Sequence, residues 1–138
     1  MYKRLLVPVD GRELSARAMD ESIALARQLG AAITAFVAEP DMPLPNAGTQ
    51  PTSYHRQLAA HEVLSEFGER AQAAGVEFSG HHTRTDQVDD AIARAARELD
   101  CDMIVMTTHG RGVFGELLFG SHTKGVLAKS KIPLLVLH

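Results

Sequence analysis

The sequence predicts an α/β fold, a single doubly wound five-stranded parallel sheet in the order 3-2-1-4-5 with helices on both faces. Short apolar runs alternate with stripes of helical spacing along the whole chain. Several of these runs are apolar at almost every position, which indicates strands buried on both faces, as in a parallel sheet. With 138 residues and no internal repeat, the chain has the size of one domain, which we expect to span 1–138.

The first predicted strand is Leu5–Val9, an apolar run that Asp10-Gly11 closes. Apolar residues with helical spacing follow over 14–29, and Gly30 ends this first helix. The later elements repeat the two patterns: strands are expected at 33–37, 76–80, 103–106 and 133–137, and helices at 60–74, 88–99 and 121–130.

The alternation of strands and helices implies parallel strands joined by right-handed crossovers. Ligands of such folds bind beyond the carboxyl ends of the strands, where the strand order reverses. The first strand leads into Asp10, and the fourth leads into the glycine-rich segment 107–121, so we expect the site there. The segment Asp41–Thr52 is rich in proline and is predicted to be an irregular surface loop. A lid, a partner surface and a tolerated insertion all fit this loop.

Composition excludes several classes of function. The net charge is −3, so no global basic field attracts nucleic acid or a membrane surface. The segment from Arg111 to His138, in contrast, contains four Lys or Arg residues and one acidic residue, Glu116. This local excess of positive charge suits a small anion. Cys101 is the only cysteine, which excludes an intrachain disulfide and favours a reducing compartment. Neither a signal peptide nor a run of about 20 apolar residues is evident. We therefore expect a cytoplasmic protein with no nucleic-acid or membrane partner.

The segment 106–123 reads MTTHGRGVFGELLFGSHT. Glycines lack Cβ and adopt positive φ, so that backbone N–H groups can converge on an anion. Gly120 and Ser121 then open a helix, whose N-terminal N–H groups favour phosphate. The alternative is a connecting loop that needs its glycines only for turns.

Two common phosphate motifs do not fit this segment. Gly115 and Gly120 have the spacing of a Walker A loop, but Ser121 stands where that motif needs lysine. The run Gly110–Gly115 matches G-x-G-x-x-G, yet no acidic residue follows Glu116 to hold a ribose. The chain is therefore neither a typical P-loop ATPase nor a typical dinucleotide-binding protein.

Five short motifs lie along nearly the whole chain, at 6–11 (LVPVDG), 102–106 (DMIVM), 108–111 (THGR), 117–121 (LLFGS) and 132–136 (IPLLV). Through these motifs together the chain resembles the universal stress protein family. The nucleotide-binding branch of that family has the pattern G-x-x-G, nine residues, then G-[ST]. Gly110 and Gly120-Ser121 have the nine-residue gap, whereas Thr107 replaces the first glycine of the pattern. The Cβ of Thr107 would crowd the ribose or the phosphates, or its hydroxyl would donate to them.

This resemblance implies an adenine-nucleotide site in which Asp10 accepts hydrogen bonds from the ribose or the base, while Val37 and Met106 wall the base. The residues alone also place Asp10 at the crevice, and the alternative is that it serves as the N-cap of the next helix. The phosphates would be held mostly by backbone N–H groups around Gly110 and after Gly120. The implied binding residues are Pro8, Val9, Asp10, Val37, Met106, Thr107, His109, Gly110, Arg111, Gly120, Ser121, His122 and Thr123.

Three functions stay open. The first, which the resemblance favours, is a cytoplasmic stress-response regulator that binds ATP or AMP, with or without Mg²⁺, and turns over little or none. The second is a dimeric stress or scaffold protein that binds no nucleotide because of Thr107. The third is a slow ATPase or phosphotransferase, for instance one that phosphorylates its own Ser121. The resemblance also implies a homodimer through the last strand, Ile132 to Leu137.

The remaining polar residues suggest neither a catalytic centre nor a metal site. His81 and His82 are adjacent on a predicted strand and point to opposite faces, and His55 and His61 lack helical ligand spacing. His109 fits a general base near the phosphates, but the interpretation we favour is a loop histidine held by backbone hydrogen bonds. Arg111 and Lys124 are compatible with phosphate contacts or with solvated surface charge.

Overall fold

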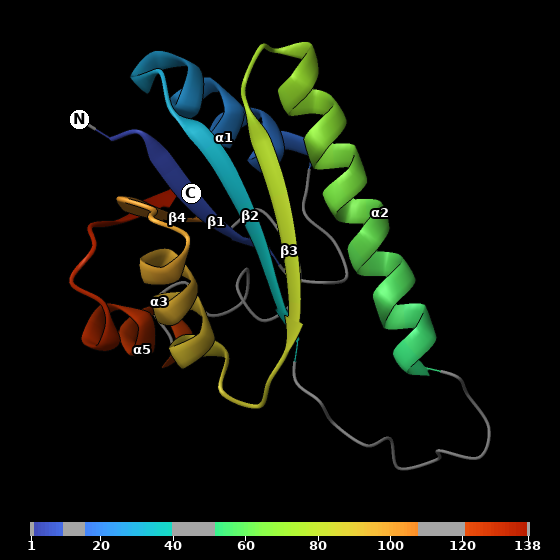
Figure 1. Cartoon of the computed structure of the whole chain (residues 1–138), viewed down its shortest axis with the longest axis vertical. Coiled ribbons are helices and arrows are strands. Elements are labelled where there is room, and N and C mark those ends of the chain that lie inside the picture. The colour runs from blue at the N-terminus through green and yellow to red at the C-terminus, as the bar shows by residue number, and fades with distance from the viewer. Residues whose placement is uncertain (1, 10–15, 40–51, 108–120, 138) are drawn as a thin grey trace.

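The computed structural model describes residues 2–9, 16–39, 52–107 and 121–137, with the side chains at 39, 52–59, 107 and 121–123 left out. Strands and helices alternate among the described elements (Figure 1). In chain order these elements are β1 (Arg4–Val9), α1 (Ala16–Leu29), β2 (Ala32–Glu39), α2 (Thr52–Ala73), β3 (Phe78–Arg84), α3 (Val88–Glu98), β4 (Met103–Thr107), α5 (Ser121–Lys129) and β5 (Leu134–Leu137).

The strands form one parallel sheet in the order β3-β2-β1-β4-β5, which confirms the predicted fold class and strand order. Most boundaries lie within two residues of the sequence prediction, but β3 extends to Arg84 rather than ending at residue 80, and α2 begins well before the predicted residue 60. β3 starts at Phe78 rather than at residue 76, because Val76 N–H donates to Ala71 C=O and so closes the end of α2. α2 starts at Thr52, the residue that the prediction placed last in the proline-rich loop; the other residues of that loop, 41–51, lie outside the described part of the chain.

β1 supplies side chains to both faces of the sheet, since Leu5 to Val9 are all buried. α1 and α2 cover one side of the sheet, and α3 and α5 cover the other (Figure 1). Leu5, Val7 and Val9 belong to the apolar cluster on the first side, and Leu6 belongs to the cluster on the second. The first cluster also contains Met19 and Ile23 of α1 and Phe67 and Ala71 of α2. The second also contains Ile92 and Ala96 of α3 and Val126 of α5.

α2 packs on β3 through an aromatic pair and a glycine. The rings of Phe67 and Phe78 lie 5.2 Å apart between their centroids and are tilted by 54°. Gly68 leaves room for the Phe78 ring, because a Cβ at position 68 would lie 3.1 Å from Phe78 Cδ1. A Cβ at Gly80 of β3 would lie 3.4 Å from Leu64 Cδ2, an ordinary van der Waals distance. Gly68 is therefore the glycine that lets the long helix approach the edge strand closely.

Asp102 joins the start of β1 to the start of β4. Its carboxylate accepts the N–H groups of Lys3 at 2.8 Å and Arg4 at 3.1 Å, and its own N–H donates to Arg4 C=O at 2.9 Å. Burial by itself raises the pKa of this carboxyl group, but the N–H donors of Lys3 and Arg4 favour the charged form more, so the pKa lies below its ordinary value.

Asp102→Asn is expected to lower the free energy of unfolding at pH 7 by about 1 kcal/mol, because one amide oxygen replaces two carboxylate acceptors. The folded-state pKa is depressed, so this stabilisation is present above the ordinary pKa of about 4 and is lost as the pH falls through the folded value. Urea denaturation should therefore show a smaller difference between the two proteins at about pH 3 than at pH 7. Asp100→Asn, at an exposed neighbouring position, is the control. An equal difference at both pH values would contradict the role of the charge.

Candidate functional site

The point where the strand order reverses lies between β1 and β4. From β1 the chain continues to β2 on one side, and from β4 it continues to β5 on the other. All strands are parallel, so Val9 and Thr107, the last residues of β1 and β4, end toward the same edge of the sheet. This is the carboxyl edge, where doubly wound sheets bind their ligands.

The ladder between β1 and β4 stops well before this edge. β1 pairs with β2 as far as Val9 and Val37, and β4 pairs with β5 as far as Thr107 and Leu137. Between β1 and β4, in contrast, pairing covers only Leu5 with Met103 and Leu6 with Ile104. The last three residues of each strand are therefore not paired with each other at the switch point.

Pro8 explains where this ladder ends. Lys3 C=O accepts the N–H of Ala32 next to β2, and Arg4 C=O accepts the N–H of Asp102 next to β4. Successive residues of a strand direct their backbone groups to alternate neighbours. Residues 6 and 8 therefore face β4, as Arg4 does, and the nitrogen of Pro8 lies on the β4 side. Proline has no N–H, so β4 receives no donor at this position.

α5 brings a helix N-terminus to the same edge. It connects two parallel strands, runs antiparallel to them, and so begins at the carboxyl edge with Ser121. Its first turn carries no acidic residue. The N–H groups of a first helical turn have no acceptor within the helix, and together with the positive end of the helix dipole they favour an anion there.

The described part of the chain includes some of the predicted site residues. Pro8, Val9, Val37 and Met106 are buried near the ends of three neighbouring strands. Val9 and Val37 are paired and face α1 and α2, whereas Met106 faces α3 and α5, so these side chains approach the edge from opposite faces. Thr107 ends β4, and Ser121, His122 and Thr123 open α5. The other predicted residues, Asp10, His109, Gly110, Arg111 and Gly120, lie outside the described ranges.

The model of the universal stress protein family matches residues 1–138. The chain belongs to this family. A universal stress protein of Thermus aquaticus is 29% identical over 139 residues, which cover 99% of this chain and 98% of the relative. A solved universal stress protein in complex with cAMP is 25% identical, with a TM-score of 0.67 and coverage of 99% and 97%. Another, from Archaeoglobus fulgidus in complex with dAMP, is 24% identical, with a TM-score of 0.68 and coverage of 99% and 98%.

Within its described residues, this universal stress protein has no group of three or more His, Cys, Asp or Glu side chains that could hold a metal ion. His81 lines the same hollow as Leu99, on the face of the sheet that α3 covers. Strand alternation places His82 on the opposite face, which α2 covers. Cys101 is buried, and this burial raises the pKa of its thiol even though a hydrogen bond with Thr34 opposes the shift. Among the same residues, no helix is both long and apolar enough to cross a membrane.

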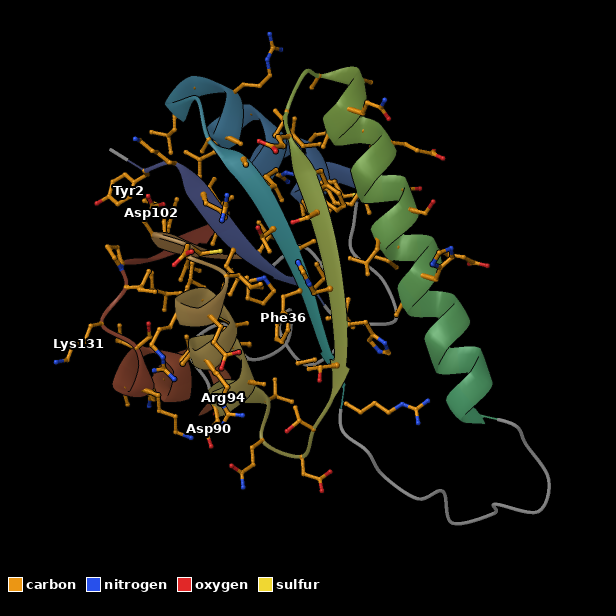
Figure 2. All side chains as sticks on the ribbon, in the orientation of Figure 1. Tyr2, Phe36, Asp90, Arg94, Asp102 and Lys131 are labelled. Carbon is orange, nitrogen blue, oxygen red and sulfur yellow. The ribbon has the colours of Figure 1, made fainter. Side chains whose placement is uncertain are left out.

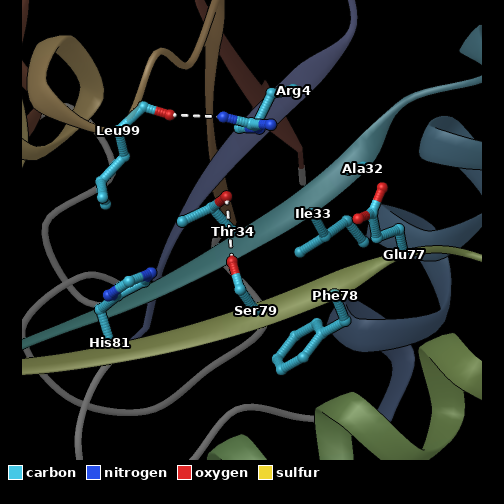
Figure 3. A pocket seen from close by; sticks show the side chains of 9 residues that line it. All are labelled: Arg4, Ala32, Ile33, Thr34, Glu77, Phe78, Ser79, His81 and Leu99. Atoms are coloured by element: carbon cyan, nitrogen blue, oxygen red, sulfur yellow. Dashed lines mark hydrogen bonds between the residues drawn. The ribbon is translucent and has the colours of Figure 1, made fainter.

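The hollow that His81 lines, of about 240 Å³, lies near the amino ends of the strands (Figure 3). Its floor is formed by the Thr34 and Ser79 hydroxyls, 3.4 Å apart on paired strands. On one side, Arg4 Nη1 donates to Leu99 C=O at 3.0 Å. This hollow lies away from the carboxyl edge and contains none of the predicted nucleotide-binding residues.

The sequence analysis missed a constraint on α5. Gly125 lies in the interior of this helix, where glycine is a poor helix former, and an isolated glycine in a helical pattern is the signal that could have revealed it. A Cβ at this position would overlap the Asp89 carboxylate of α3.

Pro8→Val is expected to extend the ladder between β1 and β4, because it restores an N–H on the β4 side. Amide hydrogen exchange should then show protection at position 8 like that of Leu6, whose N–H faces the same strand. Pro8→Gly is the control for backbone freedom without a β-favouring side chain. Exchange at position 8 of the valine variant as fast as that of an exposed amide would contradict this account of the ladder.

Proposed function

We propose that this universal stress protein binds an adenine nucleotide, ATP or AMP, where β1 and β4 cease to pair, and that it acts in the cytoplasm as a stress-response regulator with little or no turnover. The observation that carries the proposal is the unpaired end of β1 and β4 at the switch point, with α5 beginning at the same edge. The relatives solved with cAMP and dAMP support adenine as the base.

In this proposal the two halves of the nucleotide meet different elements. The nucleoside lies against the ends of the strands, where Asp10 accepts from the ribose or the base and Val37 and Met106 flank it. The phosphates lie at the start of α5, where the N–H groups after Gly120 donate to them, joined by those near Gly110. The phosphates bind with or without Mg²⁺.

We further propose a homodimer that pairs β5 of two protomers. β5 lies at the end of the strand order, and each of its four residues is half-buried in the single chain. Pro133 C=O accepts the N–H of Ile104, so alternation directs the N–H groups of Leu134 and Val136 away from β4. An edge with free N–H groups and apolar side chains pairs readily with its own symmetry mate.

The nucleotide proposal is tested by calorimetric titration of the purified protein with ATP, ADP and AMP, after mass spectrometry for co-purified nucleotide. The expected result is saturable binding that Asp10→Ala weakens about tenfold or more, the usual cost of losing a charge-assisted hydrogen bond. Asp20→Ala, which removes a surface carboxylate on α1, is the control and should bind normally. If no nucleotide co-purifies and no heat is measured at millimolar ligand, nucleotide binding is contradicted, and the scaffold function is the alternative that remains.

Thr107→Gly separates the two roles of this side chain. Tighter binding in the glycine variant would show that the Thr107 Cβ obstructs the site, and weaker binding would show that its hydroxyl is a ligand. A hydrolysis rate above background that Ser121→Ala abolishes would instead support the enzymatic function.

The dimer is tested with Val136→Pro, which removes an outward N–H and leaves the alternate groups that pair with β4. Analytical ultracentrifugation should show a dimer for the wild-type protein and a monomer for this variant. Val136→Ala controls for the lost side chain and should stay dimeric. A wild-type protein that is monomeric at micromolar concentration would contradict the proposed pairing.

A further inference from the structure

α5 lies against α3 without room for a side chain at its centre (Figure 1). A Cβ at Gly125 would overlap the Asp89 carboxylate, lying 2.6 Å from Asp89 Cγ and 3.1 Å from Asp89 Cβ. Both distances are shorter than van der Waals contact, and an aspartate side chain is too short to move away without changing its χ1 rotamer. A side chain at position 125 would therefore require Asp89 to change its χ1 rotamer or α5 to move away from α3.

A second contact holds the same two helices one turn further on. Lys129 Nζ lies 2.9 Å from Asp90 Oδ1, and the hydrogen bond with Asp90 raises the pKa of Lys129. Asp90 stands in the first turn of α3, as Figure 2 shows. Val126, between the two contacts, is fully buried in the cluster that also contains Ile92 of α3.

These contacts act on the helix whose N-terminus faces the site. Gly125 comes four residues after Ser121, which corresponds to about 6 Å along a helix. A helix moves nearly as a rigid body over such a distance, so a displacement at Gly125 also displaces the N–H groups of the first turn. Hydrogen bonds from these groups to a phosphate require donor–acceptor distances within a few tenths of an ångström of their optimum.

We propose that Asp89 and Asp90 of α3 are positioning residues for phosphate binding, which act through Gly125 and Lys129 of α5. Together they hold the start of α5 where its N–H groups meet the phosphate, and they thereby set the preference of the site for phosphorylated adenosine over adenosine. This inference rests on the nucleotide binding proposed above. It adds a selectivity that the ends of the strands, which face the nucleoside, do not provide.

The test compares the affinities for AMP and adenosine, measured by calorimetry on the full chain. Gly125→Ala should weaken AMP binding about tenfold, as expected for losing a charge-assisted hydrogen bond, and should leave adenosine binding within about twofold. A purely structural role would lower both affinities together or neither. Asp89→Ala in the Gly125→Ala background removes the overlapping carboxylate and should restore most of the preference for AMP.

Two matched controls lie on the other side of the sheet. Gly68→Ala introduces a Cβ inside α2 at 3.1 Å from Phe78 Cδ1, a milder crowding than at Gly125, and should leave the ratio of the two affinities unchanged. Asp20→Asn breaks the ion pair between Asp20 and Arg70, whose atoms lie 3.0 Å apart. It is the control for Asp90→Asn, which breaks the ion pair between Asp90 and Lys129, and it should leave the preference for AMP unchanged. Asp90→Asn alone should reduce the preference for AMP about twofold to threefold, since exposed ion pairs contribute weakly.

The outcomes separate this inference from the proposed function. If the wild-type protein binds neither AMP nor adenosine, the proposed function is wrong and the inference falls with it. If the wild-type protein prefers AMP and Gly125→Ala keeps the same preference, only the inference is wrong. An equal loss of AMP preference in Gly68→Ala would also overturn it, because that variant does not touch α5.

Discussion

The burial of β1 on both faces and along both edges is the constraint on which the rest of the structure depends. A strand with every side chain buried from Leu5 to Val9 needs a helix layer on each face and a strand on each side. Its alternate residues therefore serve two apolar clusters, one with α1 and α2 and one with α3 and α5. Asp102 then determines how β4 meets β1 at their amino ends, by accepting two backbone N–H groups.

The same central strand also opens the candidate site. A strand paired along both edges to its end would leave no backbone free at the switch point. Pro8 keeps the burial, because its ring is apolar, and withholds an N–H on the side of β4. Within β1, Leu5 and Leu6 pair with β4 and join the two strands, whereas the residues after them leave the backbone at the switch point unpaired between β1 and β4.

The α/β fold class was predictable from the sequence because burial and periodicity are properties of single segments. The end of the ladder was not, since it depends on which neighbour the nitrogen of Pro8 faces, and that requires the register of three strands. The start of β3 was missed for a related reason: Val76 looks like a strand residue, but its N–H closes α2. Gly125 and Asp89 are 36 residues apart, and only the packing of α5 on α3 brings them together.

Thr107 illustrates how the structure narrows a departure from a family pattern. This residue ends β4 and pairs with Leu137, and threonine suits extended backbone of this kind. A glycine in its place would not be needed for positive φ, which among the described non-glycine residues only Asp100 adopts. What a glycine would supply at position 107 is therefore space at the carboxyl edge. In the nucleotide site proposed above, Thr107 would therefore act through its side chain rather than through its backbone conformation, whereas the contacts of α5 with α3 are proposed to act on the phosphate side.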